Sequence, residues 1–172
     1  MIVLISIGEV EEATVKALGQ SLTQVFEQRT QIGDRMPLPR DGWNQRRGQY
    51  LGLSLLSLIL LPDLGNRVLG VVDVDIFTTG LNFVFGLADI RGKRALISLE
   101  RLRQEFYGLP RDEDLFLERA LKEAVHELGH TYRLGHCSDP TCVMHFSNSL
   151  PDTDLKGWNF CYVCHGKVSR KI

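Results

Sequence analysis

The sequence lacks the features that mark a membrane protein, an exported protein or a nucleic-acid-binding protein. Its first residues carry no basic segment and turn acidic at Glu9, unlike a signal peptide. The apolar run 51–61 is far shorter than the roughly 20 residues that a membrane span needs. The 20 Lys and Arg residues are scattered over a chain of net charge −1, so no basic patch indicates nucleic acid. We therefore expect a cytoplasmic monomer without a nucleic-acid or membrane partner.

The composition is that of an ordinary globular protein, with 44% hydrophobic and 24% charged residues, and 172 residues suffice for one domain with a core. β-Branched apolar runs bounded by turns predict strands, and apolar residues at helical spacing predict helices. The predicted strands are 2–7, 68–77, 81–90 and 94–99, and the predicted helices are 9–28, 45–60 and one that begins near Pro110. Pro62 and Gly65 would end the second helix, 29–42 would be a loop, and the last two strands would pair antiparallel. The pattern predicts an α/β fold.

Two histidines on the third predicted helix, His126 and His130, lie four residues apart and so project from one face at a separation that suits a shared metal ion. Glu127 lies beside them, where a carboxylate can take the proton of a zinc-bound water. His136 supplies a third ligand after the helix. Three protein ligands leave the fourth tetrahedral position open, which is typical of a catalytic zinc rather than a structural one.

The alternative is that these histidines are ordinary helix residues. The apolar positions of the helix form a stripe opposite the histidines, made by Leu117, Leu121, Ala124 and Leu128. This periodicity predicts that His126 and His130 face away from the core. A polar-facing pair with an adjacent glutamate and a third histidine favours the metal site.

Cysteine is scarce, and all four residues fall in the last third of the chain as Cys137-x4-Cys142 and Cys161-x2-Cys164. Reducing conditions favour metal ligation over disulfides, and this spacing is typical of a closed four-thiolate structural zinc. Residues 137–172 hold few aliphatic side chains, so we expect an irregular segment that the metal orders. The alternatives are four incidental thiols, or a redox C-x-x-C, which normally opens a helix in a thioredoxin-like fold. His145 and His165 are left out because four thiolates complete the shell.

The histidine motif, the cysteine pattern and the intervening Met144 together resemble the archaemetzincin family of metzincin zinc metallopeptidases, over residues 126–164. The resemblance implies one compact α/β domain over 1–172, with a mixed twisted sheet packed on helices that include the active-site helix. An upper part of about 1–135 and a small irregular lower part of about 136–172, ordered by the four-cysteine zinc, are implied as well.

The resemblance also implies roles for two further features. Met144 would be the Met-turn residue, a hydrophobic support beneath the histidines rather than a ligand, although it could equally be a simple core methionine. The strand Phe83–Ala88 would be the edge strand above the cleft, where an extended peptide adds as another strand, or else an ordinary sheet strand.

One position departs from the family pattern. Metzincins carry glycine at the third position after the second histidine, in a left-handed turn, and here that position is Arg133. A left-handed Arg costs roughly 1–2 kcal/mol more than Gly. We expect the turn to stay at Arg133, because moving it to Gly135 would shift His136 away from the metal.

These observations predict a zinc-dependent peptidase with two Zn²⁺ per chain, in which Glu127 acts as general base and acid on a peptide or protein substrate. The resemblance implies that this function could take the form of aminopeptidase-like action on short peptides. A zinc-ordered peptide-binding module with little hydrolytic activity is the alternative. Hydrolysis of RNA is disfavoured by the all-cysteine site and by the absence of a basic patch.

Overall fold

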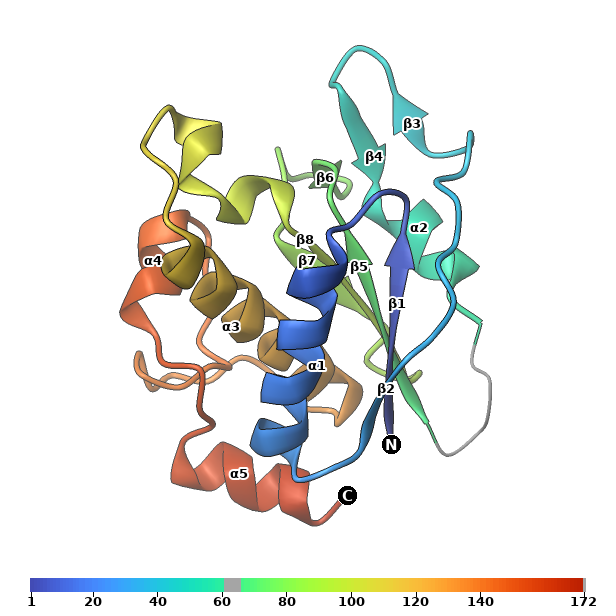
Figure 1. The fold of residues 1–172 in the computed structure, drawn as a ribbon. Coiled ribbons are helices and arrows are strands. Elements are labelled where there is room, and N and C mark those ends of the chain that lie inside the picture. Colours follow the sequence, from blue (N-terminus) through green and yellow to red (C-terminus); the bar gives the residue numbers. More distant parts are fainter. Residues whose placement is uncertain (61–65, 172) are drawn as a thin grey trace.

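A five-stranded sheet runs through the centre of the computed structural model, which describes residues 1–60 and 66–171 (Figure 1). The strand order is β2 (Thr30–Ile32), β1 (Ile2–Ile7), β5 (Arg67–Val72), β8 (Arg94–Ser98) and β7 (Gly86–Ala88). The first four strands are parallel, whereas β7 pairs antiparallel with β8 at one edge. The sheet is therefore mixed, as predicted.

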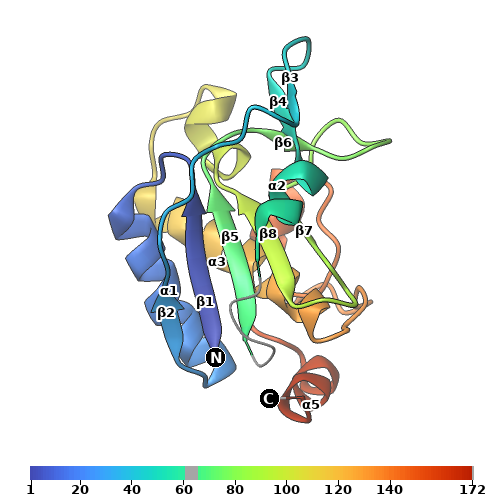
Figure 2. The same cartoon turned by 90° about the vertical axis from the view of Figure 1, so that its right-hand side faces the viewer.

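Helices cover both faces of this sheet. On one face lie α1 (Glu12–Phe26) and α3 (Glu113–Thr131), and on the other lies α2 (Gly52–Leu58). Figure 2 shows α2 in front of the sheet and α3 behind it. Strand β8 contributes side chains to the hydrophobic cores on both faces of the sheet. Ala95 and Ile97 pack toward α3, whereas Leu96 packs toward α2. A strand buried on both faces is apolar throughout, which is why β1 and β8 could be predicted.

Smaller elements complete the fold. A three-stranded sheet contains β3 (Trp43–Asn44), β4 (Gln49–Leu51) and β6 (Ile76–Phe77), and the 3₁₀ turns η1 (Glu100–Leu102) and η2 (Gln104–Tyr107) precede α3. The C-terminal segment forms α4 (Leu150–Leu155), on the side of α3 away from the sheet, and α5 (Tyr162–Ser169), below the C-terminal end of α1 (Figure 1). No helix within the described ranges has the length and apolarity to cross a bilayer.

Several predicted element boundaries are wrong. The predicted loop 29–42 contains β2, whose three residues are too few to give a periodic pattern and which pairs with β1. The predicted helix 45–60 is a helix only over α2, because Gly48, with φ of 64°, closes the turn between β3 and β4. Pro62 and Gly65 lie outside the described residues.

The predicted strands 68–77 and 81–90 were also too long. The first splits into β5 and β6, and only β7 of the second is paired. The antiparallel pairing of β7 with β8 is confirmed. The tail is more regular than predicted, since α4 and α5 form despite its low aliphatic content.

Candidate metal centres

The helix that carries the histidines has a well-defined start. The Asp112 side chain accepts a hydrogen bond from the Leu115 backbone N–H at 3.0 Å, and Glu113 and Asp114 follow in the first turn. An N-cap of this type satisfies an otherwise unpaired amide, and acidic residues there interact favourably with the helix dipole. These contacts fix where the helix begins and hence which way the histidines point.

The prediction that the histidines face away from the core is wrong. His126 is only 4% exposed, and α3 buries polar side chains on the face opposite its apolar stripe. The C-terminal segment covers that face. Two ion pairs hold it there, one from Arg119 to Asp154 at 2.6 Å and one from Lys156 to Glu123 at 3.0 Å.

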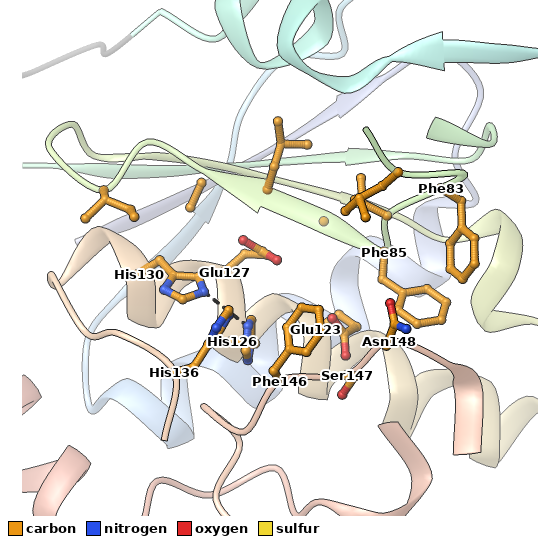
Figure 3. Close-up of a pocket in the computed structure, with 16 residues that line it drawn as sticks. Phe83, Phe85, Glu123, His126, Glu127, His130, His136, Phe146, Ser147 and Asn148 are labelled. Atoms are coloured by element: carbon orange, nitrogen blue, oxygen red, sulfur yellow. Dashed lines mark hydrogen bonds between the residues drawn. The ribbon is translucent and has the colours of Figure 1, made fainter. Parts of the chain in front are cut away.

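The three histidines converge on one point (Figure 3). Nε2 of His126 and Nε2 of His130 are 3.1 Å apart, and the candidate ligand atoms of all three rings lie within 4.8 Å of one another. Two nitrogens on one tetrahedral zinc, each at about 2.0–2.1 Å, would be about 3.3 Å apart. The spacing therefore fits a shared zinc ion.

Backbone carbonyls orient two of these rings. His126 Nδ1 donates to the Val143 carbonyl at 2.8 Å, and His130 Nδ1 donates to the Leu134 carbonyl at the same distance. A ring that donates through Nδ1 keeps Nε2 free to accept or to bind a metal. Burial is the main cause that lowers the pKa of each of the three histidines, and that of His126 falls well below its usual value. The rings are thus neutral near pH 7, as metal ligands must be.

Glu127 lines the same cleft as the histidines and is 6% exposed. Burial, followed by the charge of Glu123, raises the pKa of Glu127 well above its usual value. The carboxylate packs against β7, since a Cβ on Gly86 would lie 2.6 Å from Glu127 Cγ and 2.9 Å from its Oε1. Gly86 is a site residue that sequence reasoning missed, because nothing local distinguishes it from the other glycines.

Met144 is fully buried against the last turn of α3. A Cβ on Gly129, the residue before His130, would overlap the Met144 sulfur. The carbonyl of Met144 accepts a hydrogen bond from the Cys137 backbone N–H at 2.9 Å, which connects this turn to the loop that carries His136. The methionine thus lies under the histidine-bearing turn of the helix.

The four cysteines form a second cluster, with all candidate ligand atoms within 4.8 Å of one another. Cys137 Sγ and Cys161 Sγ are 3.8 Å apart, and two thiolates on a tetrahedral zinc, each at about 2.3 Å, would be about 3.8 Å apart. The Cys161 backbone N–H donates to Cys142 Sγ at 3.3 Å. All four thiols are free of disulfides. The residues fit a closed tetrahedral site.

Cys161 and Cys164 lie at the start of a helix, whereas an irregular segment was predicted here. Cys161 is the N-cap residue of α5 and Cys164 lies in its first turn, so the C-x-x-C pair does open a helix. A helix N-terminus stabilises thiolates. The backbone N–H of Cys164 is the main cause that lowers the pKa of Cys161, whereas burial raises the pKa of Cys142 and of Cys164. The convergence of Cys137 and Cys142 on the pair favours a metal site over a redox pair.

Arg133 adopts the left-handed conformation that was expected of it, with φ of 60°. The Leu134 N–H donates to the Gly129 carbonyl at 3.2 Å and the Arg133 N–H donates to the His130 carbonyl at 2.8 Å. These two bonds are those of a Schellman motif, which normally carries glycine at this position. The turn has not moved to Gly135, and His136 reaches the other two rings, with its centroid 5.1 Å from that of His130.

The cleft in front of the histidines has a volume of about 270 Å³. β7 forms its upper wall and is the last strand of the sheet, so the predicted edge position is confirmed for Gly86–Ala88. Phe146, Ser147 and Asn148, which follow the Met144 turn, form the lower wall (Figure 3). The site therefore combines a free strand edge, three convergent imidazoles and a buried carboxylate.

Comparisons with known proteins agree with this geometry. The family model described as "Peptidase family M54" matches residues 60–170 of this chain. The archaemetzincin of Methanocaldococcus jannaschii is 48% identical over 94% of this chain and 89% of its own length. Among solved structures, an archaemetzincin from Archaeoglobus fulgidus complexed with malonate is 38% identical with a TM-score of 0.85, covering 97% of this chain and 99% of that one. A zinc-dependent peptidase from Methanocorpusculum labreanum has a TM-score of 0.88 at 28% identity, covering 98% and 100%. The chain thus belongs to peptidase family M54, the archaemetzincins, and is a zinc metallopeptidase.

Proposed function

We propose that His126, His130 and His136 hold a catalytic zinc and that Glu127 is the general base and acid of peptide-bond hydrolysis. The four cysteines would hold a second, structural zinc, giving two Zn²⁺ per chain. The observation that carries the proposal is the convergence of three neutral imidazoles beside a buried carboxylate in one open cleft.

A zinc ion bound by the three histidines supplies a Lewis acid that acidifies water and polarises a carbonyl. The protein's own contribution begins with β7, whose free edge at Gly86–Ala88 pairs with the main chain of an extended substrate and fixes the scissile bond in the cleft. The carboxylate oxygen of Glu127 then accepts a proton from the attacking water and passes it to the nitrogen of the leaving amine. A raised pKa suits both steps, because a base must also act as an acid near the working pH.

Other residues around the histidines keep the reacting groups in place. Gly86 lets the strand approach the Glu127 side chain without a collision, so substrate and carboxylate are held close together. The carbonyls of Val143 and Leu134 keep the imidazoles in one tautomer. Two carboxylates of α3 line the cleft, Glu123 and Glu127. The buried Lys156 compensates the charge of Glu123, which leaves Glu127 for proton transfer.

Glu127→Gln tests the proposal, because it removes the base and keeps the side-chain volume. Hydrolysis of a peptide library should fall by at least about 100-fold, the usual contribution of a positioned acid–base group, while both zinc ions stay bound. Asp114→Asn, a change near the start of the same helix, serves as the control and should keep full activity. Loss of zinc in Glu127→Gln would make this residue a ligand instead. A wild-type protein that binds peptides but cleaves none would indicate the peptide-binding module.

A further inference from the structure

A second hollow, of about 360 Å³, lies where strands β5 and β8 begin and helix α3 ends. Figure 2 shows α5 below the same end of the sheet. We call this hollow the basic pocket, because none of its lining residues is acidic and five of them are cationic: Arg67, Arg91, Lys93, Arg133 and Lys171. These positions are far apart in the sequence, so no run of basic residues predicts the pocket.

Arg67 is held in the basic pocket by an aromatic ring. Its guanidinium carbon lies 3.4 Å from the ring centroid of Tyr132, a fully buried residue. The Nε atom of Arg67 is buried and has no hydrogen-bond partner among the described residues. Burial is also the main cause that lowers the pKa of Arg67. The guanidinium thus carries its charge in a poorly hydrated place, and a bound anion would compensate that charge.

The cations of the basic pocket lack counter-charges within the protein. Lys93 has a partner of its own and is not counted here. No carboxylate within 1–60 or 66–171 forms an ion pair with the other four, which are Arg67, Arg91, Arg133 and Lys171. Four positive charges around one hollow repel one another, so the arrangement favours a ligand that is itself negative.

The end of α3 explains only part of this cluster. Lys171 Nζ donates to the Tyr132 carbonyl at 2.6 Å, as cations at a helix C-terminus often do. The helix dipole, however, amounts to only about half a charge. Arg133 also occupies a left-handed position, with φ of 60°, where glycine would be free of strain. A charged side chain at a strained position points to a use for its charge.

The chemistry of the pocket selects phosphate groups. Arginine side chains match the oxygens of phosphate through two parallel hydrogen bonds. The backbone N–H groups of Arg91 and Gly92 already donate to Asp89 Oδ1, so side chains must hold the ligand. One phosphate monoester carries a charge of about −1.5 to −2, which leaves about half of the four cations uncompensated. Two phosphate groups on one small molecule would balance them, and a volume of about 360 Å³ is within the range of small-molecule pockets.

We propose that the basic pocket binds a small molecule with two phosphate groups, held by the side chains of Arg67, Arg91, Arg133 and Lys171. The proposal is independent of the proposed hydrolysis, since none of these residues belongs to either candidate metal centre. A ligand there contacts Arg133 and thereby fixes the loop between His130 and His136. Binding should therefore stabilise the zinc-loaded protein.

Calorimetric titration of the zinc-loaded protein, in about 150 mM NaCl to screen weak surface contacts, tests the proposal. The probes are fructose 1,6-bisphosphate, fructose 6-phosphate and fructose. We expect the bisphosphate to bind at least about tenfold more tightly than the monophosphate, because an added hydrogen bond between charged groups is worth about that factor, and fructose not to bind. A saturating concentration of the bisphosphate should raise the melting temperature by a few degrees.

Three outcomes of this titration would overturn the proposal. The first is the absence of saturable binding. The second is sulfate that binds as tightly as the bisphosphate, which would indicate a non-selective anion contact. The third is a ten-nucleotide single strand that binds tenfold more tightly than the bisphosphate, which would indicate nucleic acid instead.

Charge-removing variants locate the site. Arg91→Gln and Arg133→Gln each remove one charge at an exposed position, and each should weaken bisphosphate binding by about tenfold. Arg46→Gln, which changes an exposed arginine outside the pocket, is the matched control and should bind like the wild type. An equal loss in Arg46→Gln would overturn the proposal, since it would show binding to net charge alone.

A second control excludes the candidate catalytic centre. The double variant His126→Ala/His130→Ala removes two of its ligands and should bind the bisphosphate with unchanged affinity. Lost binding in this variant, with binding retained in Arg91→Gln and Arg133→Gln, would place the phosphate groups on the zinc and contradict the basic pocket.

Discussion

The two candidate metal centres are adjacent in the sequence, at His136 and Cys137, yet the chain builds them differently. The histidine centre belongs to a long helix packed between a sheet and the C-terminal segment, and backbone carbonyls orient two of its rings. The cysteine centre joins a loop to the start of the short helix α5, whose Tyr162 is 94% exposed. The histidine centre is thus preorganised by the fold, whereas the cysteine centre must itself order the C-terminal segment.

The largest expected effect is on the cysteine centre. In Cys161→Ser we expect the segment around α5 to lose its order and the histidine centre to weaken, because a structural zinc contributes on the order of 10 kcal/mol. The coupling passes through Cys137, whose amide donates to the Met144 carbonyl beneath α3. Limited proteolysis together with zinc content measures the effect. His165→Ala, an exposed position in the same helix, is the control, and unchanged protease resistance in Cys161→Ser would contradict the four-cysteine site.

The next prediction separates the two centres by pH. Zinc binds neutral imidazole and thiolate, so binding releases a proton wherever the free ligand is protonated. Burial lowers the pKa of His126 and of His130, which leaves these rings neutral at pH 7, whereas burial raises the pKa of Cys142 and of Cys164. Affinity at the cysteine centre should therefore rise with pH, by about tenfold per unit for each proton released, while affinity at the histidine centre stays nearly constant from pH 7 to 8.

Competition with a chromophoric zinc chelator at pH 7.0, 7.5 and 8.0 measures this difference. The double variant His126→Ala/His130→Ala identifies the release phase that belongs to the cysteine centre. Equal pH slopes for the two phases would show that the histidines are not preorganised as neutral ligands.

A smaller effect should follow from Gly86→Ala, which addresses the histidine centre alone. The added Cβ would lie 2.6 Å from Glu127 Cγ and 2.8 Å from the Leu96 carbonyl oxygen, so either β7 or the carboxylate must shift. We expect a loss of stability of about 1–3 kcal/mol, as for other overpacked sites, with lower hydrolysis and both zinc ions retained. Gly166→Ala, where an added Cβ meets no atom within 4 Å, is the matched control for thermal melts and peptide cleavage. Full activity in Gly86→Ala would mean that Glu127 need not lie against β7.

The contrast between the two centres also explains what could be predicted from sequence. Local sequence patterns could be recognised without knowledge of the fold. They are the fixed spacing of His126, His130 and the four cysteines, and the apolar runs of β1 and β8. The burial of His126 was mispredicted because α3 alone shows one apolar face, and the segment that covers its other face is held by the distant pairs Arg119–Asp154 and Lys156–Glu123. Gly86 could not be found either, since its role depends on a side chain that meets it across the cleft.

The smallest effect concerns Arg133, which lies in the loop that joins the two centres. Its φ of 60° costs roughly 1–2 kcal/mol relative to glycine, and its side chain is exposed. Arg133→Gly removes that strain but adds about 0.5–1 kcal/mol of unfolded-chain entropy, so the net change should be a gain in stability of about 0–1.5 kcal/mol.

The neighbouring Gly135 supplies the opposite test of the same turn. It has no positive φ, and an added Cβ would meet no atom within 4 Å, so Gly135→Ala should be neutral or slightly stabilising. Thermal melts of Arg133→Gly and Gly135→Ala with zinc bound measure both changes, and each should shift the melting temperature upward by a few degrees at most. Zinc occupancy should hold in both, because neither change moves the backbone that brings His136 to the other two rings. A clear drop in melting temperature for Arg133→Gly would mean that the arginine side chain stabilises the loop by more than its backbone strain costs.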